Sequence, residues 1–499
     1  MSERKKQQVR VKDNSEPKIA DPGEWAKCTF GTTKLGHVRR TRRLVFSAAR
    51  IASEPEKSFP EIFDWKDLKG FYCLCDQKRA TPEAIQGPHR EQTRTAMGEH
   101  PVVLVLHDTS QIDFTSHSAL QGRGPIGDSI GQGFLQHNSL AVLPSPRRLL
   151  GLAHQQLRTR IPAPVGESSR SRKRRERESQ MWLEGINATG RPPEGCTWVD
   201  VGDRGADIYE AMEASLSVGH HFLFRATQDR VVHPTTKLDE EVHLLQYART
   251  LLSKGHDTVE IPGRGGRPAR TAKVALTSAR VWVPPPKGTP QRKSRPTLPC
   301  WVIRVWEPDP PADVKEPLEW VLLSALRATK LAEIKQRRDW YTCRWLVEVY
   351  HDVEKNGCII EERRFETARR MSACLAVLAL VALRVLQMRL GLLWQPQLPA
   401  EQVASKVERE VLSLWLETQV ITVSDFVRGV STLGGFLARK GDGQPGVRSL
   451  WRGYQRLQDM VVGYQLRDRT PTASHSRVDC SLLSPLRSHI HDFSPSLFG

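Results

Sequence analysis

Two short apolar runs, each ending in an aspartate, constrain the fold more than any other feature of this sequence of 499 residues. The first is PVVLVLHD at 101–108, and the second is TWVDVGD at 197–203. Continuous aliphatic and β-branched residues over such a length are typical of buried strands. The second run precedes a helical pattern at 206–219 and another strand, HHFLFRAT, at 220–227. This succession predicts an α/β core with a partly parallel sheet.

Further short strands are expected on both sides of that unit. Two of them, at 134–143 and 148–157, follow a glycine-rich link and form a meander. Residues 228–330 then break the alternation of strands and helices, because their connectors are rich in glycine, proline and arginine. We expect a β-rich insertion there, with strands at 257–262, 272–283, 300–307 and 319–325.

The charge balance indicates a polyanionic partner. The formal net charge is +18, from 74 Lys+Arg against 56 Asp+Glu, which favours nucleic acid over an acidic membrane surface. The apolar segment at 373–383 stops at Arg384, so it predicts a buried helix and no membrane span. Nine scattered cysteines without a CxxC pair predict a reduced cytoplasmic protein without zinc or structural disulfides.

An arginine-rich helix is expected at 38–52, VRRTRRLVFSAARIA, which contains five arginines and no acid. Its apolar residues can face a core while the arginines face outward. Two interpretations stay open, a helix lying on DNA phosphates and a solvated basic face. The candidate DNA contacts in this helix are Arg39, Arg40, Arg42 and Arg43.

One carboxylate stands among cations in YTCRWLVEVYHDVEK, at 341–355. On a single helix of about 3.6 residues per turn, the spacing would place four polar side chains in one narrow stripe. These residues are Tyr341, Arg344, Glu348 and Lys355. Binding a divalent metal beside a phosphate backbone is one reason for such a stripe.

Asp108, Asp203 and Glu348 are the candidate catalytic and metal-ligating residues. Either aspartate alone would be interpreted as a turn or helix cap. Three carboxylates from two strands and a helix could instead hold two Mg²⁺ ions, or Mn²⁺ ions, about 3.5–4 Å apart for phosphoryl transfer. The sequence lacks HExxH spacing, so we interpret the histidines at 220–221 and His351 as surface or packing residues.

Taken together, the motifs resemble those of a known family. The spacing Y-x2-R-x3-E-x6-K covers 341–355, while LVLHDTSQIDF (104–114) and VDVGDRGADIYE (199–210) surround the two aspartates. EPLEWVLLS (316–324) and the segment at 433–459 extend the similarity. On these residues the chain resembles the DDE transposases of bacterial insertion sequences, in the IS-four family that includes the transposon-five enzyme.

The resemblance implies an α/β fold whose core is a ribonuclease-H-like mixed sheet, interrupted by the β-rich insertion. It also implies an N-terminal domain that recognises the element ends and a C-terminal helical region that pairs two subunits. The expected divisions are a disordered leader at 1–20, a helical DNA-binding domain at 21–97, a catalytic domain at 98–395 with the insertion at about 228–330, a helical dimerisation region at 396–465 and a disordered tail at 466–499.

The resemblance also implies roles for residues near the cut. Tyr341, Arg344 and Lys355 would bind phosphates, and Arg204 and Arg225 are further phosphate contacts. Trp320 would stack on a flipped base, or be a core residue of its strand. The sequence departs from some relatives at 352, where an aspartate replaces a lysine and would weaken the grip on the DNA end.

The activity implied is cut-and-paste transposition by a Mg²⁺-dependent enzyme. A homodimer would bind terminal inverted repeats in double-stranded DNA, cleave them through a hairpin intermediate and join the ends to target DNA. Such a protein would be cytoplasmic and associated with the bacterial nucleoid. Two alternatives stay open, a decayed DNA-binding repressor and a ribonuclease-H-like nuclease without strand transfer.

Overall fold

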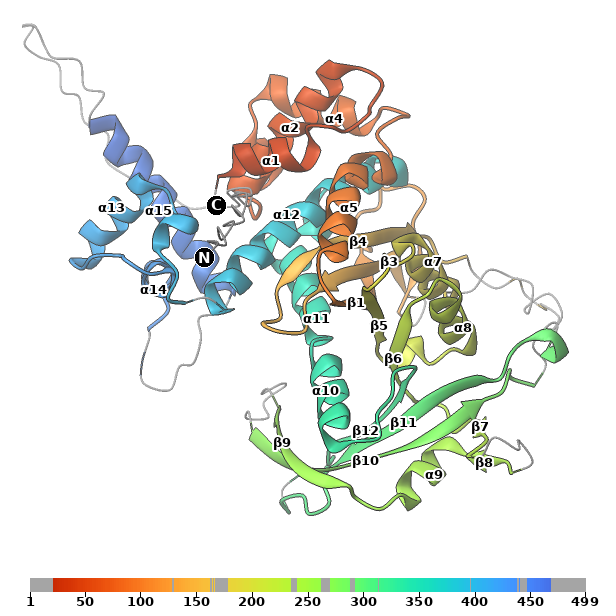
Figure 1. Ribbon diagram of the computed structural model, residues 1–499. Coiled ribbons are helices and arrows are strands. Elements are labelled where there is room, and N and C mark those ends of the chain that lie inside the picture. The colour runs from red at the N-terminus through yellow and green to blue at the C-terminus, as the bar shows by residue number, and fades with distance from the viewer. Residues whose placement is uncertain are drawn as a thin grey trace, which may run out of the picture.

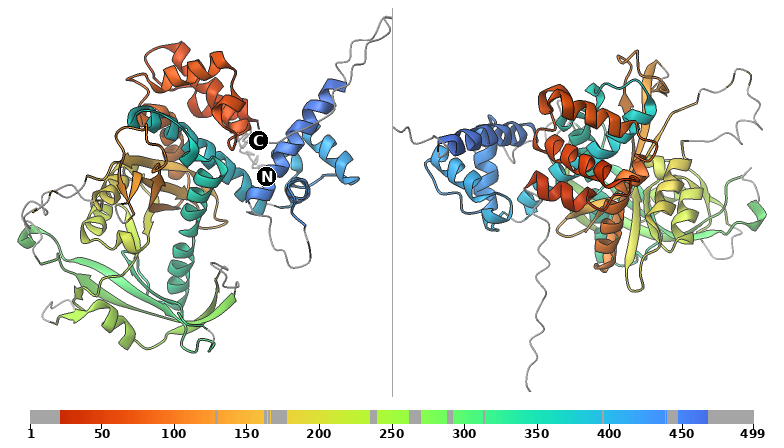
Figure 2. Two further views of the ribbon diagram at one scale, coloured as in Figure 1. Left: turned by 180° about the vertical axis from the view of Figure 1, so that it is seen from behind. Right: turned by 90° about the horizontal axis from the view of Figure 1, so that it is seen from above.

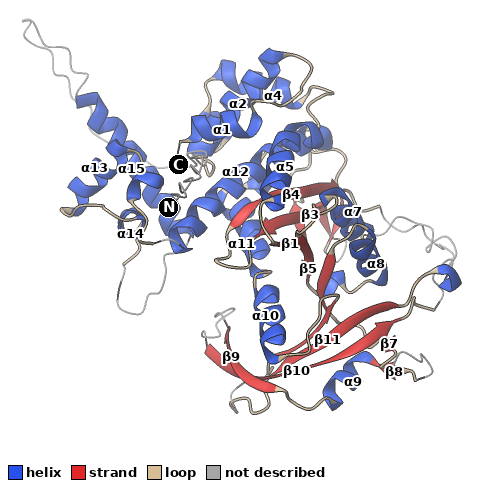
Figure 3. Ribbon diagram, in the orientation of Figure 1, coloured by secondary structure: helices blue, strands red, loops and turns tan. Residues whose placement is uncertain are grey.

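The computed structural model describes residues 21–467, apart from gaps at 128–129, 162–163, 165, 167–177, 235–239, 262–269, 288–291, 313, 395, 438 and 440–446. The predicted leader at 1–20 lies outside the described residues, and so does the predicted tail from residue 468 onward. The fold is mixed α/β, with one large sheet and helices on both of its faces (Figure 1, Figure 3).

A ten-stranded sheet forms the centre of the molecule. Its strand order is β2-β3-β1-β5-β6-β12-β11-β10-β9, and β4 pairs with β3 off this path. β5 runs parallel to β1 and to β6, and the other neighbours are antiparallel. The strands of the first half are β1 (Val102–Asp113), β2 (Gly124–Ile126), β3 (Gly131–Val142), β4 (Leu149–Arg158), β5 (Thr197–Gly202) and β6 (His221–Arg225).

The four strands expected in the insertion are all present, and they extend the central sheet. β12 pairs antiparallel with β6, so the insertion adds its strands beyond the parallel unit. A small separate sheet joins β7 (Val231–Val232) to β8 (Val242–His243). The larger strands are β9 (Gly255–Ile261), β10 (Arg270–Val283), β11 (Leu298–Trp306) and β12 (Glu319–Ser324).

Different helices cover the two faces of the sheet. α7 (Gln180–Thr189) and α8 (Tyr209–Ser217) cover one face, and α9 (Leu244–Thr250) packs on β11 in the insertion. α10 (Leu331–Thr342), α11 (Trp345–Asp352) and α12 (Ala368–Trp394) lie on the opposite face (Figure 1). The apolar residues of β1 alternate between these faces, as the two-residue period of a strand requires.

The N-terminal helices form a bundle beside α12 (Figure 1, Figure 2). They are α1 (Pro22–Phe30), α2 (Val38–Ser53), α3 (Phe59–Ile62), α4 (Trp65–Cys75) and α5 (Pro82–Gly98). Side-chain caps begin α1, α2, α4 and α5, because Asp21, His37, Asp64 and Thr81 accept hydrogen bonds from the first helical turns. α5 continues from this bundle onto β4, which links it to the sheet.

α12 is a long apolar helix, and it is a core helix. The stretch Ala368–Leu390 has a mean hydropathy of 2.0 and would pass as a membrane span by length, but 83% of it is buried inside the protein. Arg384 is fully buried there and donates a hydrogen bond to the carbonyl oxygen of Ala52 at 3.0 Å. The prediction of a buried helix at this position is confirmed.

The C-terminal helices have a small core of their own, to one side of the sheet (Figure 2). Leu412, Val430 and Leu457 are at its centre, one from each helix. The helices are α13 (Lys406–Leu416), α14 (Val423–Leu433) and α15 (Val447–Arg467). Capping boxes begin α13 at Ser405 and α14 at Thr422.

Two local predictions were wrong. β1 continues to Asp113, so Asp108 lies inside the strand and does not end it. The helix expected over 341–355 is divided into the end of α10, α11 and a π-helical turn at Val353–Gly357. The first break is a tight turn, in which Arg344 N–H bonds to Tyr341 O at 3.0 Å. Tyr341, before the break, is buried, and Glu348, after it, is exposed.

Candidate active site

Strand register brings Asp108 and Asp203 to the same level of the sheet. In the parallel pair of β1 and β5, Leu106 lies beside Val201, two residues before each aspartate. Asp203 follows β5 directly and begins a short 3₁₀ turn, in which its Oδ1 accepts from Gly205 N–H at 2.7 Å. Both aspartates therefore come to the region where β5 ends.

Asp108 is a buried carboxylate among like charges. Its side chain is 17% exposed, and its Oδ1 accepts a hydrogen bond from Thr109 N–H at 2.9 Å. Burial, followed by the negative charges of Asp203 and Glu348, raises the pKa of Asp108 from 3.8 to about 7, against the opposing charge of Arg344. The structure thus brings the three predicted carboxylates within electrostatic reach of one another.

Glu348 reaches this site from α11, although its carboxylate is engaged elsewhere. Oε1 lies 2.5 Å from a terminal guanidinium nitrogen of Arg344, four residues earlier. Among the residues that the structure describes, no group of three His, Cys, Asp or Glu side chains is close enough to hold a metal ion. The donor set fits a hard divalent cation, because all three groups are carboxylates that repel one another. Glu348 would have to leave Arg344 to join it.

Cations and aromatic rings surround the carboxylates on the side of β6. Arg225 ends β6, one of its terminal nitrogens donates to Glu319 O at 3.2 Å, and it interacts with Tyr341. Burial, with the neighbouring cations Arg204 and Arg344, lowers the pKa of Arg225. Such a group of guanidinium ions beside carboxylates is suited to a phosphate, which accepts several charge-assisted hydrogen bonds.

Trp320 packs edge-on against Tyr341 beside this group of cations. The ring centroids are 5.3 Å apart, with an angle of 65° between the planes. Trp320 is partly buried against the core, so the strand-core interpretation and the base-stacking interpretation both stay open. Tyr341 itself is 4% exposed, and that burial leaves little of its ring to contact DNA in this conformation.

Lys355 lies apart from these cations. It belongs to the π-helical turn, donates to Gln111 O at 2.5 Å and lies 3.3 Å from Glu361. The structure therefore does not place it with the cations around Asp108. Asp352 is exposed, and its Oδ1 accepts from Asn356 Nδ2 at 2.7 Å.

The arginines of α2 differ in how freely they could contact DNA. Arg39 and Arg42 are exposed, as predicted. Arg43 instead forms an ion pair with Asp67 at 2.5 Å, and Arg40 donates to Leu35 O at 3.0 Å. These two are half-buried, because the neighbouring helix and loop supply acceptors that the α2 sequence does not reveal.

Sequence reasoning missed three polar residues beneath the site. His351, on α11, is 8% exposed, and its Nδ1 lies 3.7 Å from Asp108 Oδ2. Burial lowers the pKa of His351 to about 3, so it is neutral. Asn138 lies opposite Asp108 on β3, and Glu354 is buried in the π-helical turn. The spacing of three residues between Glu348 and His351 was a usable signal, because such residues share a helix face.

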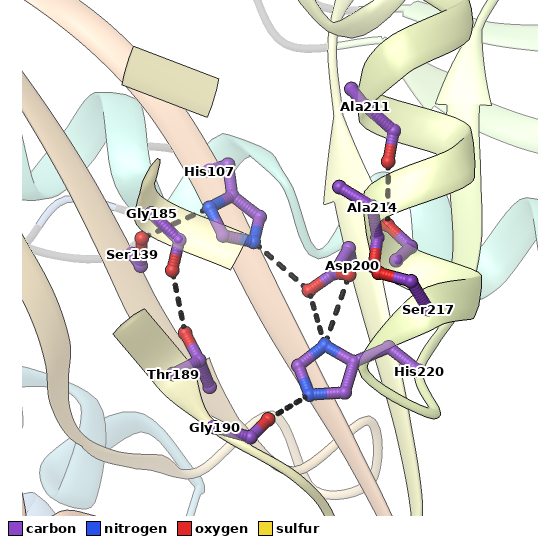
Figure 4. A network of polar contacts seen from close by, with 11 residues as sticks. His107, Ser139, Gly185, Thr189, Gly190, Asp200, Ala211, Ala214, Ser217 and His220 are labelled. Carbon is purple, nitrogen blue, oxygen red and sulfur yellow. Dashed lines mark hydrogen bonds and ion pairs between the residues drawn. The ribbon is translucent and has the colours of Figure 1, made fainter. Parts of the chain in front are cut away.

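A second polar network lies on the other face of the sheet (Figure 4). Asp200 accepts from His107 at 3.0 Å and from His220 at 3.0–3.1 Å, and His220 also reaches Gly190 O at 2.7 Å. His107 in turn bonds to Ser139 Oγ at 2.9 Å. The side chains of the aspartate and both histidines are fully buried. His220 was interpreted from the sequence as a surface or packing residue. It is a packed residue and does not lie at the surface.

Two family models match the chain near its ends. The model described as "Transposase DNA-binding" matches residues 22–80, which include α1 to α4. The model described as "Transposase Tn5 dimerisation domain" matches residues 380–471, which include the end of α12 and the C-terminal helices. DNA binding and homodimer formation follow from these two domains. With both of them on one chain, the resemblance seen in the sequence to the Tn5-like transposases of the IS4 family is confirmed.

Proposed function

We propose that the protein cleaves the ends of a transposable element and joins them to target DNA, using Asp108, Asp203 and Glu348. The observation that carries this proposal is the convergence of three carboxylates from β1, the end of β5 and α11, where burial, together with repulsion from the other two carboxylates, raises the pKa of Asp108. Bound Mg²⁺ ions would activate the attacking hydroxyl and stabilise the leaving 3′ oxygen.

Strand order supports a ribonuclease-H-like core for this activity. β4, β3 and β1 are antiparallel neighbours, and β5 and β6 continue the sheet parallel to β1. β1 therefore lies at the centre, with Asp108 on the face that α11 covers. The strands β9 to β12 are the insertion between β6 and the helix that carries Glu348.

Arg344 would couple DNA binding to completion of the site. Its guanidinium holds Glu348 in the structure without DNA, and it is also the group best suited to bind a phosphate with two parallel hydrogen bonds. A phosphate that takes the guanidinium frees Glu348 to turn toward Asp108 and Asp203. Arg225 and Arg204 would bind the same strand, and Trp320 would stack on a base displaced in a hairpin.

The test uses a linear duplex that carries the inverted repeats found beside the coding sequence. With Mg²⁺, the wild type is expected to nick the repeats and leave hairpin ends. Glu348→Gln should lower the cleavage rate by about 10³-fold or more while duplex binding in a gel-shift assay is kept. Cleavage retained by this variant would refute the assignment of Glu348.

Glu184→Gln is the matched control. Its side chain is 46% exposed and pairs with Arg158, whereas Glu348 is 45% exposed and pairs with Arg344. Cleavage by the control should equal that of the wild type. Binding without cleavage by the wild type would favour a repressor, and cleavage without joining to a target plasmid would favour a nuclease.

A further inference from the structure

A row of polar side chains crosses three strands under the candidate active site. Asp108 on β1 lies opposite Asn138 on β3, and Asn138 lies opposite Gln155 on β4. Asn138 and Gln155 are no more than 3% exposed, and α11 places His351 over Asp108 and Asn138. Buried amides are expected to satisfy their hydrogen bonds inside the protein, so each amide in the row has a defined orientation.

A donor-only group sets the direction of this row. Arg90, on α5, has no acceptor atoms and donates to Gln86 Oε1 at 2.7 Å. Gln86 must then present its Nε2, which donates to Gln155 Oε1 at 2.7 Å. Gln155 Nε2 in turn donates to Asn138 Oδ1 at 2.9 Å. An arginine thus orients three successive amides, all in the same sense.

The last amide determines which ring nitrogen of His351 carries the proton. Because Asn138 Oδ1 is already an acceptor, the atom 3.0 Å from His351 Nε2 is the donor Nδ2. His351 Nε2 must accept, and a neutral imidazole then carries its one proton on Nδ1. Glu354 supports the same orientation of Asn138. Its carboxylate accepts from Gln136 Nε2 at 2.7 Å, and the same nitrogen donates to Asn138 Oδ1 at 3.3 Å.

We propose that His351 is a positioning residue for Asp108, oriented by the chain Arg90–Gln86–Gln155–Asn138. Its Nδ1–H faces Asp108 Oδ2 at 3.7 Å, while Thr109 N–H holds Oδ1 at 2.9 Å. The first distance is too long for a hydrogen bond, but such contacts in unliganded sites shorten when the site is filled. The two donors fix the carboxylate plane for a cation. This role rests on the proposed function of Asp108 as a metal ligand.

The position of the proton can be measured directly. The full chain, labelled with ¹⁵N at its 16 histidines, would be studied without metal by proton–nitrogen correlation NMR, and His351→Asn identifies the signal. The wild type is expected to carry the proton on Nδ1. Asn138→Asp replaces the donor by an acceptor, so the proton should move to Nε2. A wild-type proton on Nε2 would overturn the proposal.

Metal affinity provides the second test, by titration of Mn²⁺ into the protein without DNA. His351→Leu should weaken Mn²⁺ binding about 10–100-fold, as loss of a partner of a metal ligand does elsewhere. His351→Asn keeps a donor near the position of Nδ1 and should recover most of the affinity. The control is His233→Leu in the insertion, because His233 is 7% exposed and His351 is 8% exposed.

The outcomes separate this inference from the proposed function. If His351→Leu lowers the melting temperature but binds Mn²⁺ like the wild type, His351 has only a packing role and the inference fails. If the wild type cleaves DNA but His351 carries its proton on Nε2, the inference fails and the proposed function stands. If the NMR and Mn²⁺ results are as expected but the wild type does not cleave DNA, the proposed function fails and the positioning role stands.

Discussion

Two consecutive residues of β1 point to opposite faces of the sheet. Each face holds a carboxylate, and the surroundings of the two carboxylates differ. His107 points toward α7, where Asp200 accepts hydrogen bonds from two histidines. Asp108 faces α11, where Asp203 and Glu348 repel it. Burial alone would raise the pKa of Asp200, but the charge of His220 and the hydrogen bonds from both histidines hold it well below its ordinary range. The pKa of Asp108 is raised to about 7.

The difference shows that the supply of donors, more than burial, separates a structural carboxylate from a candidate catalytic one. Each oxygen of Asp200 has a histidine partner, and both histidines have further partners in Ser139 and Gly190. The Asp108 carboxylate accepts from Thr109 N–H, the one hydrogen bond that it receives within the described part of the chain. A buried carboxylate with few donors remains ready to bind a cation, at a cost in stability.

The largest effect on stability is expected for Asp200→Asn. The substitution leaves His107 and His220 buried without the anion that pairs with them, so the free energy of unfolding should fall by about 3–5 kcal/mol. Urea denaturation followed by circular dichroism measures the change. A loss below about 1 kcal/mol would mean that the network is not the stabilising counterpart of the site.

Asp108→Asn should raise the free energy of unfolding at pH 8, whereas Asp200→Asn lowers it. It should also change how the stability depends on pH. The folded protein keeps a proton on Asp108 up to about pH 7, whereas the unfolded chain releases it near 3.8. The folded state therefore binds more protons between those values, and stability falls as pH rises, by up to about 1.4 kcal/mol per pH unit for one group. The Asp108→Asn variant has no carboxyl group to titrate at this position, so it should not show this loss.

Urea denaturation in EDTA at pH 4, 5.5, 7 and 8 would show the effect. The variant should be more stable than the wild type at pH 8 and similar to it at pH 4. A variant that loses stability at pH 8 would place Asp108 with Asp200 as a structural carboxylate. Mg²⁺ should stabilise the wild type at pH 8 and leave the variant unchanged, because only the wild type has the ligand.

The smallest effect is expected for Glu354→Gln. Burial raises the pKa of Glu354 to about 7, although hydrogen bonds from Gln136 and Tyr350 lower it. A glutamine keeps a side-chain oxygen that can accept from Gln136 and from Tyr350. Unfolding free energy at neutral pH should change by less than about 1 kcal/mol. A loss near that of Asp200→Asn would show that the carboxylate is essential to the row of amides.

Local patterns in the sequence predicted most of the elements. The apolar runs became β1, β5 and β6, and the four strands of the insertion lie at their expected positions within a few residues. The arginine-rich pattern became α2, with Leu44 and Ala48 in its core, and the apolar segment before Arg384 became the buried part of α12. These features depend on periodicities of two and 3.6 residues, which neighbouring side chains determine.

Sequence reasoning failed where the outcome depended on distant segments. The stripe at 341–355 is divided between α10, α11 and the π-helical turn, and Tyr341 packs against Trp320 on the distant strand β12. The four candidate arginines of α2 were all predicted to contact DNA, but Arg43 forms an ion pair with Asp67 on α4. His351 was interpreted as a surface or packing residue because no metal-ligand spacing surrounds it, and its neighbour Asn138 is 213 positions away in the chain.

The polar residues available to the site could be identified from local sequence patterns, as two aspartates after apolar runs and a glutamate between cations. Their charge states and partners could not, because these depend on how the chain folds. Strand register set Asp108 beside Asn138 and brought it level with Asp203, and the packing of α11 on β1 brought His351 to Asp108. The physical reason is that the charge and hydrogen bonding of a buried group depend on which partners surround it, and those partners come from segments far apart in the chain.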